Sequence, residues 1–579
     1  MNGATPANGA TPTPRRRRRL LLVALGALLA LALFAAAETA LRLLGIGAAR
    51  ELLEFPSPGG PLFTREPNWL QMRGDSSLVL DRITTTRAKP AGTYRIVLVG
   101  ESTVAGFPFY PQFSVGRLLE ASLRDAFPNL KVEVVNFGRT ADPSDAVARA
   151  AIESLAVAPD VLVVMSGHND YQASYVEDLR DGLWPRLRAA LRKLRLVRLG
   201  FERVFSRDAP RPIVAEGRRI GESPWLTSTE FERGAARFRA NLESIVDAAR
   251  ARAVDVVLVT PVSNLRDFAP CYSCYSRRLT SDEQREYERL LGELEAAVEA
   301  ELLPLESERM VERLRMLDPG VALAAFLAAR RCERTGQPAD AAVLYAIALE
   351  RDGYPNRARR ALAAAVRAVA AERSARLADA ELAFANAARG PAPGRDLFLD
   401  YCHPTLEGTA LLADAIRPAV VELLARAGAP LPAQHADVPM LTRAPIDAWL
   451  ERLGLSRLRL VDGLVHAGQG TLLIHLGLPA NREPLVLARH AFEQALSIDA
   501  THAEAKQGLL AVELLDRHRD TALNLAAELQ ASAPDALRKL EEAAREMEPL
   551  RSALAALKLE FRDGRLEPAA SNDSRGRKH

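Results

Sequence analysis

Short apolar runs alternate with longer amphipathic segments through the first half of the chain. Four of these runs are rich in β-branched residues, namely Tyr94–Gly100 (YRIVLVG), Lys131–Gly138 (KVEVVNFG), Asp160–Gly167 (DVLVVMSG) and Val254–Val262 (VDVVLVTPV). Runs of this kind are typical of parallel strands that are covered on both faces. Amphipathic stretches such as Ser114–Phe127 lie between them and predict helices. The alternation predicts an α/β fold, a doubly wound and mainly parallel sheet.

A helical pattern replaces the strand pattern after the fourth run. From Thr280 to Gly394 the chain is rich in Ala, Leu, Arg and Glu, and we find no strand signal there. Residues 341–349 (AAVLYAIAL) and 488–496 (ARHAFEQAL) share the spacing A-x3-aromatic-x2-A-L. This spacing resembles the second helix of tetratricopeptide repeats, and an ordinary Ala-rich helical pair is the alternative.

The N-terminus contains one long uncharged segment. Arg15–Arg19 precede the 18-residue run Leu20–Ala37, which as a helix reaches about 27 Å, close to the roughly 30 Å hydrocarbon core of a bilayer. The five adjacent arginines disfavour a buried core helix. A cleavable signal peptide is the alternative, because the run ends in three alanines. We favour an uncleaved anchor over residues 20–44, because the run is longer than a usual signal core and continues as the amphipathic Thr39–Leu44.

The charge distribution predicts the orientation of this anchor in the membrane. The net charge of the chain is +3, and the first 50 residues, with seven arginines and one glutamate, are strongly positive. The positive-inside rule places residues 1–19 in the cytoplasm and the rest of the chain outside it, in the periplasm or at the cell surface. A nearly neutral chain does not predict a nucleic-acid partner.

The length and composition predict several folded parts. A chain of 579 residues is too long for one compact core, and its 48% apolar and 26% charged content excludes a largely disordered protein. We predict a disordered tail (1–19), an anchor (20–44), a linker (45–93), the first part of a catalytic domain (94–275), a helical insertion (276–395), the second part of the catalytic domain (396–430), a C-terminal helical repeat-like region (431–560) and a disordered tail (561–579).

Candidate catalytic residues follow the predicted strands. In doubly wound sheets, ligands bind beyond the carboxyl ends of the strands, and Ser102 stands directly after the first one. A serine nucleophile needs an imidazole base and a carboxylate that orients it. His168 and His403 are the only histidines before residue 435, and His403 alone has a carboxylate, Asp400, three residues earlier. We therefore predict Ser102, His403 and Asp400 as the catalytic residues.

An oxyanion site requires hydrogen-bond donors near the nucleophile. We predict the backbone N–H groups of Ser102 and Gly138 and the side-chain amide of Asn169 for this role, because each follows or ends a strand. Asn264, Arg266 and Asp267 follow the fourth strand, and they either line the pocket or form a turn.

These residues resemble the four blocks of the SGNH, or GDSL-type, hydrolase superfamily. Its namesake residues correspond to Ser102, Gly138, Asn169 and His403, within Gly-His-Asn-Asp at 167–170 and Asp-x-x-His at 400–403. The usual Asp before the nucleophile is replaced by Glu101. The resemblance implies a flavodoxin-like sheet and an ester hydrolase that needs no cofactor or metal.

Other sites have less support. No Gly-x-Ser-x-Gly elbow surrounds Ser102, and no Gly-x-Gly-x-x-Gly follows the first strand, which disfavours an α/β-hydrolase elbow and a dinucleotide site. Cys271 and Cys274 have no second pair at zinc-ligand spacing, so a local disulfide or two packed thiols is favoured over a metal site.

The leading hypothesis is a membrane-anchored extracytoplasmic serine esterase that acts on short acyl esters, with O-acetylated glycan as a plausible substrate. One alternative is an acyltransferase that uses the same triad and passes the acyl group to a glycan hydroxyl. Another is a non-catalytic envelope scaffold that binds a protein partner through the helical repeats.

Overall fold

The computed structural model divides the chain into two compact units, Met1–Glu51 with Arg180–Pro210, and Leu52–Leu179 with Arg211–His579. It describes residues 14–44, 53–54, 63–64, 85, 88–110, 112–171, 179, 191, 194–197, 220–221, 224, 226–300, 303, 305–429, 439–477 and 482–569. Residues 1–13 of the predicted tail (1–19) and most of the predicted linker lie outside these residues. The tail prediction is wrong for residues 14–19, which are part of a helix that begins at Pro14.

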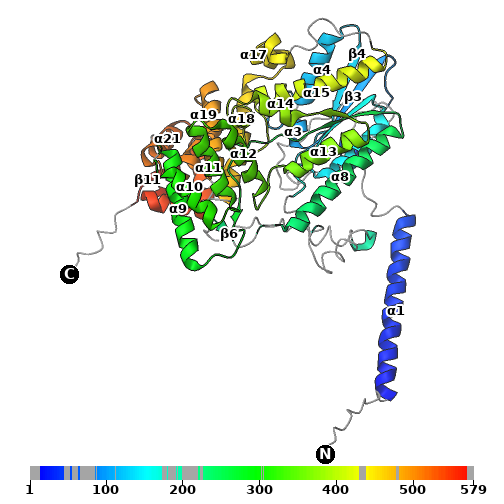
Figure 1. The fold of residues 1–579 in the computed structure, drawn as a ribbon, viewed down its shortest axis with the longest axis horizontal. Helices are drawn as coiled ribbons and strands as arrows, with labels where there is room; N and C mark the ends of the chain where they lie inside the picture. The colour runs from blue at the N-terminus through cyan, green and yellow to red at the C-terminus, as the bar shows by residue number, and fades with distance from the viewer. Residues whose placement is uncertain are drawn as a thin grey trace, which may run out of the picture. The chain divides into compact units, whose positions relative to one another are not determined.

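The larger unit contains a five-stranded parallel sheet (Figure 1). Its order is β4-β3-β5-β7-β9, from β3 (Thr93–Gly100), β4 (Lys131–Asn136), β5 (Val161–Met165), β7 (Asp255–Val259) and β9 (Arg376–Ala378). The four predicted runs are strands, and the order is that of a flavodoxin-like sheet. The chain reverses its direction of strand addition around β3, and ligands in sheets of this kind bind beyond the carboxyl ends of the strands at such a point.

Helices cover both faces of this sheet, as the β-branched runs predict. Ile96 and Leu98 belong to one core cluster, whereas Val97 and Val99 belong to another, because successive side chains of a strand point to opposite faces. The first face packs against α4 (Val115–Ala126), α14 (Ala380–Ala387) and α15 (Leu406–Arg426), and the second against α5 (Ser144–Ser154), α8 (Ser228–Arg250) and α13 (Arg360–Glu372) (Figure 1).

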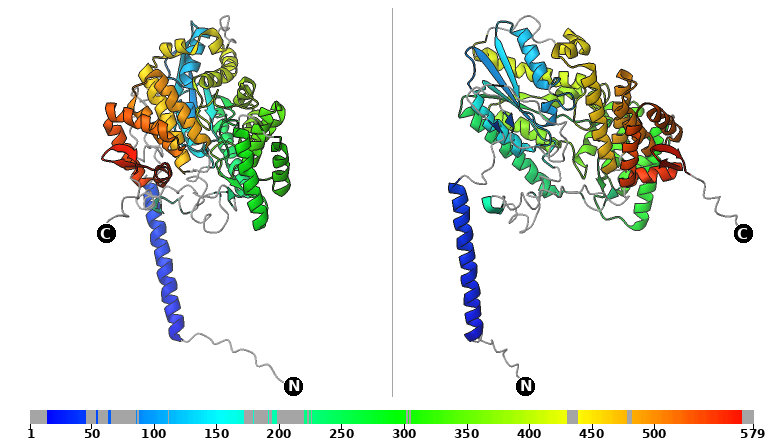
Figure 2. Two further views of the ribbon diagram at one scale, coloured as in Figure 1. Left: turned by 90° about the vertical axis from the view of Figure 1, so that its left-hand side faces the viewer. Right: turned by 180° about the vertical axis from the view of Figure 1, so that it is seen from behind.

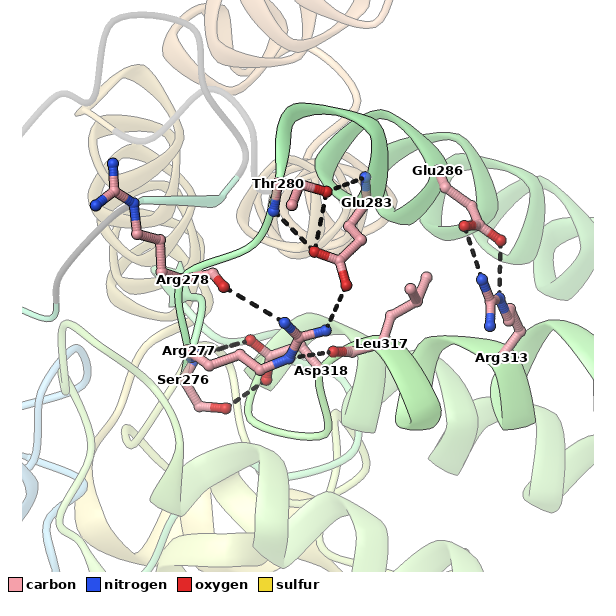
Figure 3. A network of polar contacts seen from close by, with 9 residues as sticks. All are labelled: Ser276, Arg277, Arg278, Thr280, Glu283, Glu286, Arg313, Leu317 and Asp318. Atoms are coloured by element: carbon pink, nitrogen blue, oxygen red, sulfur yellow. Dashed lines mark hydrogen bonds and ion pairs between the residues drawn. The ribbon is translucent and has the colours of Figure 1, made fainter.

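A helical insertion with its own core follows β7. It consists of α9 (Ser281–Glu299), α10 (Ser307–Leu317), α11 (Ala322–Arg334) and α12 (Pro338–Glu350). Polar contacts secure its start (Figure 3). Thr280 and Glu283 form a capping box at the N-terminus of α9, and Arg277 donates to Glu283 and to the carbonyl of Leu317. The carboxylate of Asp318 accepts the backbone N–H of Ser276, which joins the loop before α9 to the end of α10.

The insertion is shorter than we predicted. Within the predicted range 276–395, α13 covers the sheet and β9 pairs in parallel with β7, so residues 360–378 belong to the α/β domain and not to the insertion. The sequence does not reveal β9 because this edge strand has three residues, Arg-Leu-Ala, and none of them is β-branched. The absence of strands that we predicted from Thr280 to Gly394 is therefore wrong at β9.

The C-terminal region is helical, as predicted, and Figure 2 shows its helices from two further sides. They are α16 (Met440–Arg443), α17 (Ile446–Leu453), α18 (Arg457–Gly477), α19 (Glu483–Ile498), α20 (Ala503–Leu515), α21 (Arg519–Ser532), α22 (Pro534–Glu546) and α23 (Glu548–Leu557). Phe492 of α19 lies between Gly468 and Gly508, where added Cβ atoms would meet its ring at 2.7 and 2.3 Å. Small residues thus let α18, α19 and α20 pack around one ring, and the tetratricopeptide resemblance stays a prediction.

The predicted disorder of 561–579 is wrong for its first residues. Strands β10 (Leu559–Arg562) and β11 (Arg565–Pro568) form an antiparallel hairpin. Asp563 and Gly564 form its two-residue turn, both with positive φ, and an Asp-Gly pair favours such a turn. The hairpin signal was present in the sequence.

Short elements complete the larger unit. They are α3 (Ser102–Ala105), the 3-10 helix η2 (Leu155–Val157), and the paired short strands β1 (Leu53–Glu54) with β2 (Phe63–Thr64) and β6 (Ile220–Gly221) with β8 (Ser273–Cys274). The first pair lies within the predicted linker, where Lys89 also forms an ion pair with Asp160. The C-terminal part of the predicted linker therefore contacts the α/β domain through Lys89.

The smaller unit consists of a long apolar helix and a segment that contacts its end. Helix α1 (Pro14–Leu43) includes Leu25–Leu43, which is long and apolar enough to cross a membrane. The carboxylate of Glu38 accepts the backbone N–H groups of Arg195 and Leu196, and the Arg195 guanidinium donates to the carbonyl of Leu41. The end of α1 and the segment from 195 thus satisfy each other's unpaired backbone groups.

Candidate active site

Ser102 lies at a sharp turn between the first strand of the sheet and a four-residue helix. Strand β3 ends at Gly100, and Ser102 is the first residue of α3, so its backbone N–H is not used by the helix. An added Cβ at Gly100 would lie 2.3 Å from the carbonyl oxygen of Met165 in β5, so the turn needs glycine at this position. The turn presents the serine at the carboxyl edge of the sheet, as predicted.

The second part of the site is the loop before α15. Phe398 and Pro404 form an isolated antiparallel bridge that closes this loop. Within it, Oδ1 of Asp400 accepts the backbone N–H groups of Cys402 and His403, both at 2.8 Å. The Asp-x-x-His spacing therefore folds into a turn that brings the carboxylate to its own histidine.

Ser102, His403 and Asp400 form a hydrogen-bonded chain, although 301 residues separate the serine from the histidine. The distance from Ser102 Oγ to His403 Nε2 is 2.7 Å, and that from His403 Nδ1 to Asp400 Oδ2 is 2.5 Å. All three side chains are buried.

The electrostatics of this chain assign its protons. Burial raises the pKa of Asp400, but the charge and hydrogen bond of His403 and the backbone N–H of Cys402 outweigh it and hold that pKa below its usual value. An ionised Asp400 accepts the Nδ1–H of His403, which leaves Nε2 as the acceptor of the Ser102 hydroxyl proton. This is the arrangement that nucleophilic catalysis by serine requires.

The predicted oxyanion donors lie at the same edge, but two of them also have partners in the protein. The N–H of Gly138 donates to Oδ1 of Asn136 at 2.9 Å, and the amide of Asn169 donates to the carbonyl of Asp142 at 3.1 Å. The Asn169 amide carries two hydrogens and can donate twice.

Gly138 has a packing role that the sequence did not indicate. An added Cβ would lie 2.3 Å from the backbone nitrogen of Ala105 in α3. Asn136 donates to the carbonyl of Val104 in the same helix, at 2.6 Å. The end of β4 therefore positions the helix that begins with Ser102.

Glu101, which replaces the usual Asp, joins two strand ends. Its carboxylate accepts the Ser166 hydroxyl and the Gly167 N–H, both at 2.7 Å, and the His168 N–H at 3.1 Å. Burial and the charge of Asp170 raise the pKa of Glu101 to about 8. These contacts give Glu101 a structural reason to stand beside the nucleophile, which sequence reasoning missed.

His168 lies near the triad but is not arranged as a base for Ser102. Its Nδ1 accepts the backbone N–H of Ala358 at 3.2 Å. Burial and the charge of His403 lower the pKa of His168 to about 3, so the ring is neutral. The structure thus separates the two histidines that the sequence offered.

Aromatic side chains lie beside His403, and one of them packs against C-terminal helices. The ring centroids of Phe107 and Tyr401 lie 4.6 and 5.7 Å from that of His403. Tyr401 packs in one cluster with Leu487 of α19 and Ile474 of α18. The C-terminal region therefore contributes to the wall around the site, and no sequence signal pointed to that.

Helix α18 also contacts the segment that follows Ser102 and α3. An added Cβ at Gly463 in α18 would lie 2.6 Å from the ring of Phe109, which follows α3. Phe109 also belongs to the large core cluster that contains Leu464 and Val465. The catalytic sheet and the C-terminal helices share one core.

The loop of the triad also holds a set of metal-binding atoms. Asp400, Cys402 and His403 place ligand atoms within 4.8 Å of one another. Asp400 and His403 are already hydrogen-bonded to each other, as a catalytic pair is. All four cysteines are free and buried, so Cys271 and Cys274 are separate thiols and not the predicted alternative, a disulfide.

A cavity of about 820 Å³ lies beside the site. It is bounded by α12, α13 and α14 and is lined mainly by alanine and branched aliphatic side chains. Neither Ser102 nor His403 lines it, but Ala358, the partner of His168, does. The chemistry is therefore assigned from the triad and not from this cavity.

Comparisons with known proteins agree with the geometry at the level of the family. The model of the family described as GDSL-like Lipase/Acylhydrolase matches residues 96–416, more than half of the chain. No curated protein matches this chain.

Solved structures with some likeness to the chain include three bacterial proteins. A lipase/acylhydrolase from Enterococcus faecalis has 17% identity and a TM-score of 0.26, over 57% of this chain and 96% of that chain. A variant of an acetyl xylan esterase from Geobacillus stearothermophilus has 15% identity and a TM-score of 0.27, over 58% and 97%. A GDSL-like lipase from Bacteroides thetaiotaomicron has 10% identity and a TM-score of 0.25, over 57% and 88%. Likeness at this level carries no information about the substrate.

Proposed function

Because the chain belongs to the family of GDSL-like lipases and acylhydrolases, we propose that it is a serine esterase whose catalytic residues are Ser102, His403 and Asp400. The observation that carries this proposal is the hydrogen-bonded chain from Ser102 Oγ through both ring nitrogens of His403 to Asp400. Family membership by itself implies an ester hydrolase. The geometry supports serine as its nucleophile.

The first half-reaction acylates the serine. Ser102 Oγ attacks the ester carbonyl carbon while His403 Nε2 takes the hydroxyl proton, and Asp400 stabilises the imidazolium that forms. The carbonyl oxygen becomes an oxyanion that accepts the N–H of Ser102, with Gly138 and Asn169 as further donors. The C–O bond then breaks, and the leaving alkoxide takes the proton from His403.

The second half-reaction releases the acid. Water attacks the acyl carbon while His403 takes one of its protons. The bond to Ser102 Oγ breaks, and that oxygen recovers the proton from His403. The products are a carboxylic acid, an alcohol and the free enzyme.

Short acyl groups are the proposed substrate class. Ser102 and His403 are 9% and 7% exposed, and the rings of Phe107 and Tyr401 stand beside the histidine. A confined site of this kind favours a small acyl group over a long one. O-acetylated glycan belongs to this class.

The location proposed for the enzyme follows from α1. Its apolar length and the five arginines before it support a single-pass anchor with a cytoplasmic N-terminus and an extracytoplasmic catalytic unit. A reporter enzyme fused after His579 should be active only outside the cytoplasm. Activity of the reporter in the cytoplasm would contradict this orientation.

The test of the activity uses the full chain in detergent. We expect covalent labelling by a fluorophosphonate probe and turnover of nitrophenyl acetate, with slower turnover of the octanoate. Ser102→Ala should abolish both labelling and turnover, whereas Ser497→Ala, at an exposed serine of α19, should change neither. Labelling that persists in Ser102→Ala would overturn the assignment of the nucleophile. Faster turnover with a glycan acceptor, and acyl groups on that acceptor, would replace the hydrolase by the acyltransferase.

A further inference from the structure

The turn between α12 and α13 carries a buried arginine into the catalytic unit. Arg357 is 2% exposed and comes from the end of the helical insertion. One of its terminal nitrogens, Nη1, donates to the carbonyl of Asn264 at 2.8 Å and to that of Phe268 at 2.7 Å. Its guanidinium carbon lies 5.2 Å from the centroid of the Phe268 ring. Arg357 thus fixes both ends of the loop 264–268, which follows β7.

A buried carboxylate holds Arg357 in place. Asp352 lies 3.4 Å from Nη2 of Arg357, and both side chains are almost fully buried. Asp352 also accepts the backbone N–H groups of Cys271 and Tyr272, at 2.9 and 3.1 Å. Asp352 therefore compensates the charge of Arg357. The backbone of Cys271 and Tyr272, which follow the loop 264–268, fixes the position of the Asp352 carboxylate.

Asn264 links this loop to the triad. Its side-chain amide donates to the carbonyl of Asp400 at 2.9 Å, and its backbone N–H donates to the carbonyl of Tyr401 at 3.0 Å. Its side-chain oxygen accepts the N–H of Asp267 at 2.9 Å, which closes a turn. Asn264 itself is fully buried. Both donor groups of Asn264 thus hold the backbone of the loop whose carboxylate orients His403.

A second contact runs through aromatic rings. The Phe268 ring lies 5.7 Å from the Tyr401 ring, and the Tyr401 ring lies 5.7 Å from the His403 ring. Arg357 therefore reaches the catalytic loop by two routes, one through backbone carbonyls and Asn264 and one through Phe268. Arg357 thus connects the helical insertion to the loop that carries Asp400 and His403.

We propose that Arg357 and Asn264 are positioning residues of the esterase, which hold the Asp400–His403 pair in its productive geometry from the helical insertion. This inference rests on the proposed function. Both residues are buried, so they act through the loop 400–403. Loss of either should lower kcat and leave KM nearly unchanged, because the loop positions the reacting groups and does not form the binding surface.

The chemistry of Arg357 makes a conservative test available. A guanidinium donates in fixed directions to two carbonyls and stacks on a ring at the same time, whereas the ammonium of lysine is a compact charge on a flexible chain. Arg357→Lys keeps the charge that Asp352 requires and removes this geometry. We expect its kcat for nitrophenyl acetate to fall about 10- to 100-fold, with KM within about threefold of wild type.

Arg95 provides the matched control. It is fully buried in β3, where it forms an ion pair with Glu133 at 2.8 Å and donates to the carbonyl of Val157. It stands near the amino end of the strand, away from the catalytic edge. Arg95→Lys makes the same chemical change at an equally buried arginine, and it should lower the unfolding temperature while kcat per fluorophosphonate-reactive site stays at the wild-type value.

A double variant tests whether Arg357 acts on the loop 400–403 through Asn264. If Arg357 acts through Asn264, then Arg357→Lys combined with Asn264→Ala should lower kcat by less than the product of the two single effects. Fully multiplicative effects, an unchanged kcat in Arg357→Lys, or a change confined to KM would each overturn the proposal. A fall in kcat in Arg95→Lys of the same size would show a general loss of stability and would also overturn it.

A measurement without substrate separates this inference from the proposed function. The proton between Asp400 and His403 should give a low-field NMR resonance in the full chain, which Arg357→Lys should shift or broaden and Arg95→Lys should leave in place. If the wild type shows this resonance but no Ser102-dependent turnover, the proposed function fails while the link from Arg357 stands. If Arg357→Lys leaves the resonance unchanged, the link fails whatever the activity.

Discussion

The carboxylate of Glu101 accepts the backbone N–H of Gly167 at 2.7 Å, so the residue before the nucleophile is bound to the end of the neighbouring strand. Strands β3 and β5 are parallel neighbours, and their carboxyl ends therefore meet at this contact. The same carboxylate accepts Ser166 and His168. A titratable group thus holds together the turn of Ser102 and the block that contains Asn169.

Glu101 should make the stability of the fold depend on pH. Burial and Asp170 raise its pKa from 4.5 to about 8, so between these values the folded chain retains a proton that the unfolded chain has released. The free energy of unfolding should therefore fall as pH rises through this window, by at most about 1.4 kcal/mol per pH unit. Glu101→Gln should flatten this slope, as measured by urea unfolding at several pH values.

The difference in slope between wild type and Glu101→Gln from pH 6.5 to 8 measures the effect of Glu101, because other buried carboxyls with raised pKa values, such as Asp352, titrate in both proteins. Burial raises the pKa of Asp170 to about 6, and burial and His403 lower that of His168 to about 3. Asp170 therefore lowers the free energy of unfolding as pH rises towards about 6. His168 raises the free energy of unfolding as pH rises towards about 6.5, and neither group changes it much above that pH. Equal slopes for wild type and Glu101→Gln between pH 6.5 and 8 would show that Glu101 is already ionised.

Asp400→Asn tests the orientation of the catalytic histidine. The amide can keep a backbone contact to Cys402 or His403, but it can no longer stabilise the imidazolium through Oδ2. We expect kcat to fall by roughly 10⁴-fold, with the unfolding temperature close to that of wild type. Retention of more than a tenth of the wild-type kcat would exclude Asp400 from this role.

Gly138→Ala should disturb the nucleophile through packing. The added Cβ would meet the backbone nitrogen of Ala105 at 2.3 Å, and backbone cannot move aside as a flexible side chain can. We expect lower stability and a displaced α3, with slower fluorophosphonate labelling of Ser102. Gly292→Ala is the comparison, because no atom lies within 4 Å of its added Cβ in α9, and it should stabilise by up to about 1 kcal/mol. Thermal unfolding measures whether each variant is less or more stable than wild type.

Two substitutions within α18 test its contact with the turn after α3. Gly463→Ala would place a Cβ 2.6 Å from the ring of Phe109, whereas Gly470→Ala meets no atom within 4 Å. The first variant should lower both the unfolding temperature and the rate of nitrophenyl acetate hydrolysis. The second should raise the unfolding temperature and leave the rate unchanged. If both variants behave alike, the C-terminal helices do not support the site through this contact.

Much of the site could be predicted because its chemistry is local. Ser102 and Asn169 follow runs that the β-branched pattern marks as strands, and the spacing of Asp400 and His403 places them on one turn. The choice between His168 and His403 also relied on local spacing. Strand β9 could not be predicted in the same way, because its position at the sheet edge depends on β7 and not on its own three residues.

The roles of Glu101, Gly138 and Asn264 required the fold. Each is defined by a partner on another segment: Gly167 just after β5, Ala105 in α3, and Asp400 in a loop 136 residues away. Such contacts leave no periodic pattern in the sequence, since they join segments that only the sheet topology brings together.

The sequence by itself determined the positions of four strands, the candidate triad and the apolar N-terminal segment, because periodicity, motif spacing and charge are properties of neighbouring residues. Only the tertiary structure decided how far the insertion extends, that α18 and α19 share a core with the catalytic sheet, and that Arg357 reaches the loop of the triad. Those features arise from packing between distant segments, where shape and buried hydrogen bonds select the partners and local propensity does not.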